Sequence, residues 1–184
     1  VIYNPIKFNK NNFIKNNNFR MKLFGNTKFN IISLGSLKKS KDYKTLINAI
    51  YLIIQKKIDL KLFILGEGEE RKELEKIIFE KKLSNNIKLV GNVENPVEYL
   101  INGDLYVNTS LYDGMPLSLI EALLSGIPII STNCESGPRE ILQNGKYGKL
   151  IPIKDYKTLS EEIEKFIKSE KIINKIPSNI YQTY

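Results

Sequence analysis

Two acidic residues, Asp113 and Glu121, lie eight positions apart on either side of a glycine-proline helix start. Pro116 fits the first helical position, where a missing N–H costs little, and Gly126 fits the residue just past the helix end. The start of such a helix offers unpaired N–H groups and a partial positive charge, which favour an anion. Amides and a carboxylate presented together would suit a phosphorylated, hydroxyl-rich ligand such as a nucleotide-sugar.

The position of Glu121 on this helix leaves two interpretations open. At about 100° per residue, Ser118, Glu121 and Ser125 share one narrow polar strip on an otherwise apolar helix. Such a strip is usually the solvated edge of an amphipathic helix. The spacing by itself does not separate that role from ligand binding.

A second candidate is the basic loop Gly35-Ser-Leu-Lys-Lys-Ser-Lys41. It follows an apolar segment, carries no acid before Asp42 and places three ammonium groups near a predicted helix start. Lysine binds phosphate as a mobile point charge, so the loop could hold an anion, although a solvated basic loop explains it equally well.

A third glycine-containing turn, Gly66-Glu-Gly68, is weaker evidence for a ligand. Arg71 stands where a dinucleotide-binding pattern needs its third glycine, and the neighbouring glutamates would repel a pyrophosphate. We interpret it as a tight turn whose acids complement a helix dipole.

These candidates lie between alternating strands and helices. Apolar runs predict strands at 29–34, 60–65, 87–90, 104–107, 127–130 and 148–151. Periodic or capped segments predict helices at 42–54, 69–83, 95–101, 116–125, from 138, and at 156–169. This order predicts an α/β fold with a doubly wound, Rossmann-like parallel sheet of about six strands. Ligands then bind beyond the carboxyl ends of the strands, where the candidate loops fall.

Composition excludes several classes of protein and site. The chain has 184 residues, of which 42% are hydrophobic and 26% charged, as in a soluble globular domain. No apolar run approaches the ~18 residues of a membrane span. The single cysteine, Cys134, excludes an internal disulfide framework, and the absence of histidine excludes a Ser-His-Asp triad or a histidine-ligated metal from this chain.

The net charge of +8 is concentrated at one end of the chain. Residues 1–44 hold ten Lys or Arg against one acid, Asp42. A basic end can meet anionic lipid or a phosphorylated ligand. Nucleic acid is not expected as a partner, because the basic segment is interspersed with asparagines rather than with stacking aromatic residues.

Taken in order, these motifs resemble the C-terminal, donor-binding half of a retaining glycosyltransferase of the group 1 family (family 4), which has the GT-B fold. The resemblance runs from the first residues to about residue 152. Its strongest part is Asp113-Gly-Met-Pro-Leu-Ser-Leu-Ile-Glu121, which is similar to the family's E-x7-E motif. Several ordered matches favour the ligand-binding interpretation of Glu121.

The resemblance assigns roles to individual residues. It implies that Glu121 accepts hydrogen bonds from the ribose, that Asp113 faces the transferred sugar and that Lys41 neutralises the leaving diphosphate. The other expected contacts to the donor come from the basic loop, the third strand and the helix start; they are Gly35, Ser36, Gly91, Asn92, Val93, Gly114, Met115, Pro116, Leu117 and Ser118. No metal or other cofactor is expected.

The chain departs from the family pattern at two positions. Ser36 stands where the family usually has an arginine, so the cationic partner of Lys41 is missing. Losing one charged contact to a developing diphosphate could cost about 2–3 kcal/mol of transition-state stabilisation. The first acid of the motif is aspartate rather than the common glutamate. These departures bear on donor affinity or rate rather than on the fold.

The resemblance implies transfer of a hexose or N-acetylhexosamine from a UDP-sugar to a glycan or lipid-linked acceptor, with retention. Residues 1–24 are interpreted as a linker from a missing N-terminal acceptor domain, 25–170 as the nucleotide-sugar-binding domain and 171–184 as a truncated C-terminal segment. The isolated piece is expected to bind donor without turnover, in the cytoplasm, with peripheral contact to the inner face of the plasma membrane. The alternatives are a nucleotide-sugar epimerase on a related scaffold and a non-catalytic nucleotide-binding remnant.

Overall fold

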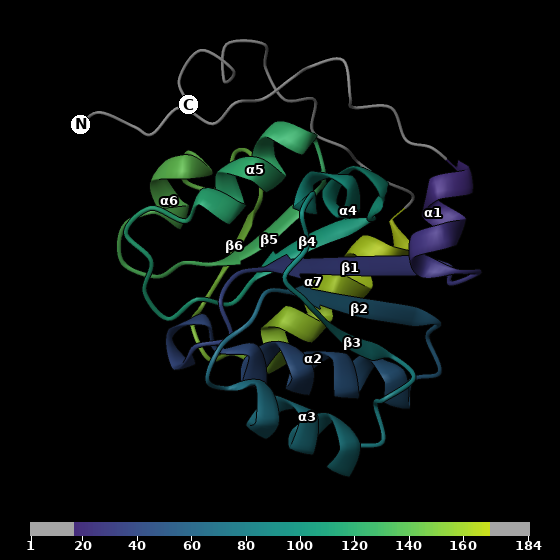
Figure 1. The fold of residues 1–184 in the computed structure, drawn as a ribbon. Coiled ribbons are helices and arrows are strands. Elements are labelled where there is room, and N and C mark those ends of the chain that lie inside the picture. Colours follow the sequence, from purple (N-terminus) through teal and green to yellow (C-terminus); the bar gives the residue numbers. More distant parts are fainter. Residues whose placement is uncertain (1–16, 170–184) are drawn as a thin grey trace.

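The fold is a three-layer α/β sandwich with a single parallel sheet at its centre (Figure 1). The structure is a computed structural model, and it describes residues 17–169. The strands are β1 (Phe29–Leu34), β2 (Leu60–Leu65), β3 (Ile87–Gly91), β4 (Leu105–Asn108), β5 (Ile129–Thr132) and β6 (Lys149–Ile151). The helices are α1 (Asn17–Phe24), η2 (Lys39–Lys41), α2 (Tyr43–Gln55), α3 (Arg71–Glu80), α4 (Pro96–Asn102), α5 (Leu117–Ser125), α6 (Pro138–Ile141) and α7 (Tyr156–Lys168).

The order of the strands creates one switch point in the sheet. The order is β3-β2-β1-β4-β5-β6, and all five pairings are parallel. From β1 the chain first moves outward through β2 and β3, then returns to β4 on the other side of β1. Strands β1 and β4 are neighbours in the sheet, but the loops that follow them run in opposite directions. The crevice between such loops is where ligands bind in doubly wound sheets. The predicted fold class is confirmed.

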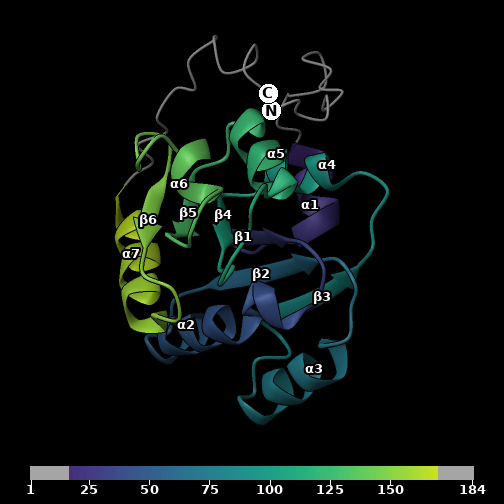
Figure 2. The same ribbon diagram turned by 90° about the vertical axis from the view of Figure 1, so that its left-hand side faces the viewer.

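Each face of the sheet is covered by its own set of helices and has its own apolar core. One face packs on α2, α3 and α7, and the other on α1, α4, α5 and α6 (Figure 2). The centre of the sheet is inaccessible to water on both faces, as Ile31 and Ile32 of β1 show. Continuous apolar runs, such as residues 62–65 of β2, are what a sheet buried on both faces requires.

Helix caps explain where two of the larger helices begin. The carboxylate of Asp42 accepts hydrogen bonds from Thr45 N at 3.4 Å and Thr45 Oγ1 at 2.7 Å, as predicted for the cap of α2. Asp155 caps α7 in the same way through Thr158. These side chains satisfy amides that the first helical turn leaves unpaired.

Several element boundaries differ from the sequence prediction by one to three residues, and one helix was not predicted. Strand β4 starts one residue later than predicted and β5 two residues later. Just before these strands, the Asp104 amide donates to the Asn30 carbonyl and the Pro128 carbonyl accepts from the Tyr106 amide.

The polar stretch before Phe24 contains α1, which was not predicted. Phe24 packs on Phe63 with ring centroids 4.8 Å apart, and Arg20 meets the buried Asp104 at 2.6 Å. Tertiary contacts rather than amphipathic periodicity hold this helix.

Most of the predicted linker, at residues 1–16, and the predicted C-terminal segment at 171–184 lie outside the described residues. Within residues 17–169, no helix is long and apolar enough to cross a membrane.

Candidate functional site

The structure brings Lys41 and Asp113 into direct contact, although they lie 72 residues apart in sequence. The Lys41 ammonium donates to Asp113 Oδ2, and their side chains are only 18% and 14% exposed. Lys41 ends η2, which follows β1, and Asp113 lies in the loop after β4. Both predicted charges therefore meet at the switch point of the sheet.

The Asp113 loop is packed closely against the start of α6. Gly137 has φ +44°, and a Cβ built on it would lie 2.2 Å from the Asp113 carbonyl oxygen and 2.8 Å from Pro116 Cδ. No larger residue fits this approach. Cys134 is buried beside the same loop, and burial together with the negative charge of Asp113 raises the pKa of its thiol. The backbone around Asp113 is thus supported from β5 and α6.

Helix α5 begins one residue later than predicted. Pro116 is the N-cap, with φ −73° and ψ 92°, and the helix starts at Leu117. The proline is buried against Gly137, so packing with α6 sets its extended conformation. Its carbonyl accepts from the amides of Leu119 and Ile120. Gly126 ends the helix at φ 78°, as predicted.

The beginning of α5 is open to solvent, which suits an external ligand. Gly114, Met115 and Leu117 are exposed, and Ser118 is half-buried. The first amides of a helix have no acceptor within the helix, so an anion at this position would find donors and a favourable dipole. The segment predicted to present amides is accordingly at the surface beside Asp113.

Glu121 lies one turn into α5 and is half-buried. Burial raises the pKa of its carboxyl. Beneath it, the fully buried Tyr106 hydroxyl donates to Ser118 Oγ at 3.1 Å. Burial is the main reason that the pKa of Tyr106 is raised, and the negative charges of Glu121 and Asp113 add to it. The buried Tyr106 phenol therefore lies within the electrostatic influence of both Glu121 and Asp113.

Tyr106 and two hydroxyl residues of the following loop were not predicted from sequence. Tyr106 has the pattern of an ordinary strand residue. Thr109 and Ser110 look like a polar strand end, yet both are buried, with exposed fractions of 1% and 0%. The available signal was the run of polar residues directly after an apolar strand, in front of the motif acid.

The other predicted contacts meet in a separate cavity of about 290 Å³, between the loops after β1, β2 and β3. Gly35, Ser36, Asn92 and Val93 all line it. The loops approach closely because Gly66 has no side chain; a Cβ there would lie 2.2 Å from the Gly35 carbonyl oxygen. Gly91 is buried and does not line the cavity, but its carbonyl accepts from the amide of Gly66, which does, at 2.8 Å.

The two halves of the candidate site are joined through Gly35. A Cβ on Gly35 would lie 3.4 Å from Lys41 Cε and 3.3 Å from the Tyr43 hydroxyl. Tyr43 donates to the Gly35 carbonyl at 3.0 Å. One end of the Gly35-Ser36 loop therefore faces the 290 Å³ cavity, and the other touches the Lys41 side chain that pairs with Asp113.

Of the three lysines in the basic loop, only Lys41 forms an ion pair with Asp113. Lys38 and Lys39 line a smaller cavity with Glu70 on the α2–α3 side. Among the described residues that line the 290 Å³ cavity, none is Lys or Arg, and Glu67 contributes a carboxylate. Ser36 therefore leaves this part of the site without a cation.

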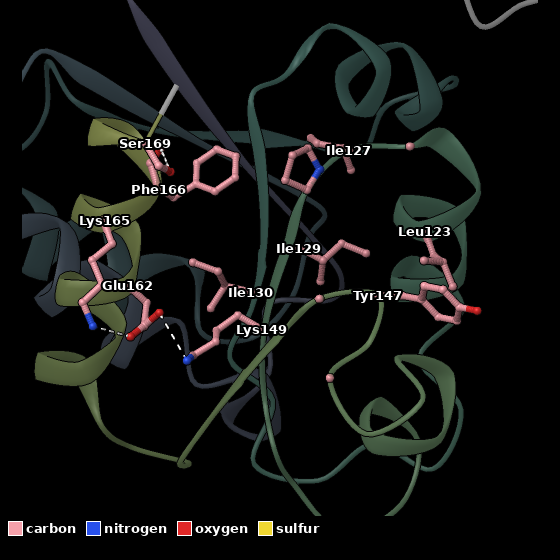
Figure 3. Close-up of a pocket in the computed structure, with 14 residues that line it drawn as sticks. Leu123, Ile127, Ile129, Ile130, Tyr147, Lys149, Glu162, Lys165, Phe166 and Ser169 are labelled. Carbon is pink, nitrogen blue, oxygen red and sulfur yellow. Dashed lines mark hydrogen bonds and ion pairs between the residues drawn. The ribbon is translucent and has the colours of Figure 1, made fainter. Parts of the chain in front are cut away.

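A further groove of about 470 Å³ lies at the opposite edge of the sheet, between α7 and the amino ends of β5 and β6. Figure 3 shows Phe166 and Ile127 on its walls and the ammonium groups of Lys149 and Lys165 both directed to Glu162, at 3.5 and 2.8 Å. None of the residues predicted to bind a ligand lines this groove. Its cations are already paired, so it offers little to an anion.

No group of three or more Cys, Asp or Glu side chains suited to a metal occurs within residues 17–169, and histidine is absent from the sequence. Independence of metal remains an expectation from the family resemblance.

Comparison with known proteins decides the family. The family described as glycosyl transferases group 1 matches residues 14–183. The chain belongs to this family. The sequence resemblance to group 1 glycosyltransferases is confirmed, and with it the assignment of the chain to a transferase family.

Among curated relatives of this group 1 domain is a Campylobacter jejuni enzyme, N-acetylgalactosamine-N,N'-diacetylbacillosaminyl-diphospho-undecaprenol 4-alpha-N-acetylgalactosaminyltransferase. The two are 30% identical over 142 residues, which cover 77% of this chain and 38% of the relative. The chain thus spans well under half of that relative's length.

Two solved structures show the same fold. Staphylococcus aureus TarM, in a complex with Fondaparinux, alpha-GlcNAc-glycerol and UDP, has a TM-score of 0.76 and 26% identity, covering 83% of this chain and 31% of TarM. Anabaena HepE, solved with UDP and glucose, has a TM-score of 0.81 and 22% identity, covering 96% of this chain and 50% of HepE. The group 1 domain therefore has the Rossmann-like architecture of the GT-B glycosyltransferases.

Proposed function

We propose that this domain binds the donor in a retaining transferase that moves a hexose or N-acetylhexosamine from a UDP-sugar to a glycan or lipid-linked acceptor. The observation that carries the proposal is the Lys41–Asp113 pair at the switch point of the sheet, in front of an exposed helix start. TarM, a relative of the same fold, was solved with UDP, which supports UDP as the nucleotide.

Each predicted residue then has a physical task. Glu121 accepts hydrogen bonds from the ribose, and the 290 Å³ cavity at Asn92 and Val93 receives the base. Lys41 stabilises negative charge on the diphosphate as the bond between the anomeric carbon and the phosphate oxygen breaks. Asp113 orients the sugar, whose new bond to the acceptor oxygen forms on the same face. The acceptor proton passes to the departing diphosphate.

Binding of the acceptor is proposed to require residues beyond this domain, since the relatives are two to three times longer than the region that they share with this chain. Holding two substrates in the correct relative orientation supplies a large part of the rate acceleration in a transfer reaction. The isolated domain is therefore proposed to bind donor without turning it over.

The experiment is a calorimetric titration of the full 184-residue chain with UDP, with ADP and GDP for comparison and a metal chelator present. We expect saturable UDP binding that persists in chelator. Glu121→Ala removes charged hydrogen bonds worth about 1.5–3 kcal/mol, so the UDP affinity should fall by about 10- to 100-fold. Glu80→Ala, on the exposed surface of α3, is the matched control and should bind as the wild type does.

Two outcomes would contradict the proposal. Failure of a folded sample to bind any of the three nucleotides would favour a remnant disabled at Ser36. Equal UDP affinity in Glu121→Ala and the wild type would remove the ribose role of Glu121.

A further inference from the structure

The polar triplet Asn108-Thr109-Ser110 at the end of β4 is buried, with exposed fractions of 5%, 1% and 0%. A buried polar group is costly unless it forms a hydrogen bond, and apolar residues of the same shape can replace a bonded pair at little cost. Stability alone therefore gives little reason for three consecutive polar residues here. The partners of these side chains indicate a different use.

Thr109 holds the backbone of Lys41. Its hydroxyl donates to the Lys41 carbonyl oxygen at 2.9 Å, across 68 positions of sequence. Two residues later, the Leu111 amide donates to the Ser40 carbonyl at 2.8 Å. These two bonds fasten the end of η2 to the loop after β4. They set the point from which the long Lys41 side chain extends.

Ser110 holds the same loop to the neighbouring strand. Its carbonyl accepts from Thr132 Oγ1 at 2.6 Å, and its hydroxyl donates to Asn108 Oδ1 at 2.8 Å. Asn108 in turn donates through Nδ2 to Ser131 Oγ at 3.1 Å. The loop that carries Asp113 is therefore anchored to β5 by buried bonds, so Thr109 connects Lys41 to a rigid support.

We propose that Thr109 is a positioning residue for Lys41. It acts through its hydrogen bond to the Lys41 carbonyl, which keeps the ammonium within reach of Asp113 and of the donor diphosphate; the second part rests on the proposed function. A long lysine side chain has many rotamers, so fixing its base reduces the conformational freedom that binding must remove. With Ser36 in place of a second cation, the placement of this one ammonium matters more.

The experiment compares Thr109→Val, which keeps the shape and loses the hydroxyl, with Thr109→Ser, which keeps the hydroxyl and loses a methyl group. The first readout needs no ligand. The full chain is treated with a limiting amount of an amine-acylating reagent, and labelling of Lys41 is followed by peptide mass spectrometry. Lys44, whose side chain is 45% exposed, is the internal reference.

The second readout is the UDP affinity by calorimetry. We expect Lys41 to be labelled several-fold faster in Thr109→Val than in the wild type. The UDP affinity of Thr109→Val should be roughly 3- to 10-fold lower, because the net contribution of one hydrogen bond is lost. Thr109→Ser should match the wild type in both readouts, even though loss of the methyl group lowers its melting temperature. A residue with only a packing role would show the opposite order, because Thr109→Val preserves packing.

Wild-type labelling of Lys41 in Thr109→Val, or equal changes in the two variants, would overturn the proposal. If Thr109→Val does not fold, Thr109→Ala replaces it, since Ala and Ser both lack the methyl group and differ only in the hydroxyl. Absence of UDP binding in the folded wild type would refute the proposed function, while the labelling rates would still decide the role of Thr109.

Discussion

Lys41 and Asp113 satisfy each other's charge. Their contact is mostly covered from water, so each charge would be costly to leave without a partner. If the diphosphate takes over Lys41, Asp113 must gain another partner at the same time. A sugar hydroxyl can donate to its carboxylate, and Ser110 Oγ already lies 3.4 Å from Asp113 Oδ2. In the proposed function, the pair thus links recognition of the phosphate to recognition of the sugar.

The carboxyl of Glu121 should lower stability at neutral pH. Its folded-state pKa is raised by burial, so its favourable contribution is present below the ordinary pKa of 4.5 and is lost as the pH rises through the raised value. Because glutamine does not ionise, Glu121→Gln removes this loss of stability at neutral pH. We expect its melting temperature at pH 7 to exceed that of the wild type by about 1–2 °C, a small gain because water still screens the group.

Thermal denaturation of Glu121→Gln and the wild type between pH 3.5 and 7.5 measures this difference, which should shrink as the pH falls below 4.5. Glu80→Gln, at an exposed position of α3, should show no comparable trend. A Glu121→Gln gain that stays constant over the whole pH range would show that ionisation is not its cause.

At the scale of elements, the site depends on how closely loops approach at the carboxyl edge of the sheet. The turn after β2 touches the loop after β1 at Gly66 and Gly35, and the turn before α6 touches the Asp113 loop at Gly137. Backbone rather than side chains fills these contacts. Glycine is required there for space as well as for conformation.

Gly66→Ala tests this contact. Its φ is +131°, and the added Cβ would lie 2.2 Å from the Gly35 carbonyl oxygen, so both strain and displacement of the Gly35 loop are expected. We expect a loss of about 2–4 kcal/mol in the free energy of unfolding, together with weaker UDP binding. Urea denaturation and calorimetry measure the two effects.

Gly25→Ala is the matched control, because Gly25 also has a positive φ, +69°, but nothing lies within 4 Å of an added Cβ. Its free energy of unfolding should fall by only about 1–2 kcal/mol because of backbone strain, and its UDP affinity should not change. Equal losses in the two variants would mean that the close approach of the loops contributes nothing.

At the scale of the whole molecule, the excess of positive charge is concentrated in the first 44 positions, which hold ten Lys or Arg and one acid. Acceptors built on lipids would bring such a domain near an anionic surface. We predict that the chain floats with vesicles containing anionic lipid at low salt and is released at about 0.5 M salt, because screening shortens the reach of surface charges. Vesicles of neutral lipid are the control. Binding that does not change with salt, or no binding at all, would contradict this prediction.

The sequence determined the class of the fold and the identity of the chemical groups. Alternating apolar runs and capped helices suffice to predict a doubly wound sheet, because strand and helix periods are local properties of the chain. The same local signals identified Gly126 as a helix end and Asp42 as a cap. Element boundaries were less accurate at the starts of β4, β5 and the Pro116 helix, where contacts with other elements decide the first residue.

Only the tertiary structure decided which groups meet. It paired Asp113 with Lys41 rather than with Lys38 or Lys39, and it placed the unpredicted Tyr106 and Thr109 beneath and beside them. It also folded α1 onto the domain through Arg20 and Phe24. Such contacts join positions tens of residues apart, and they depend on the strand order and on how closely loops can pack. Local sequence periodicity carries no information about either.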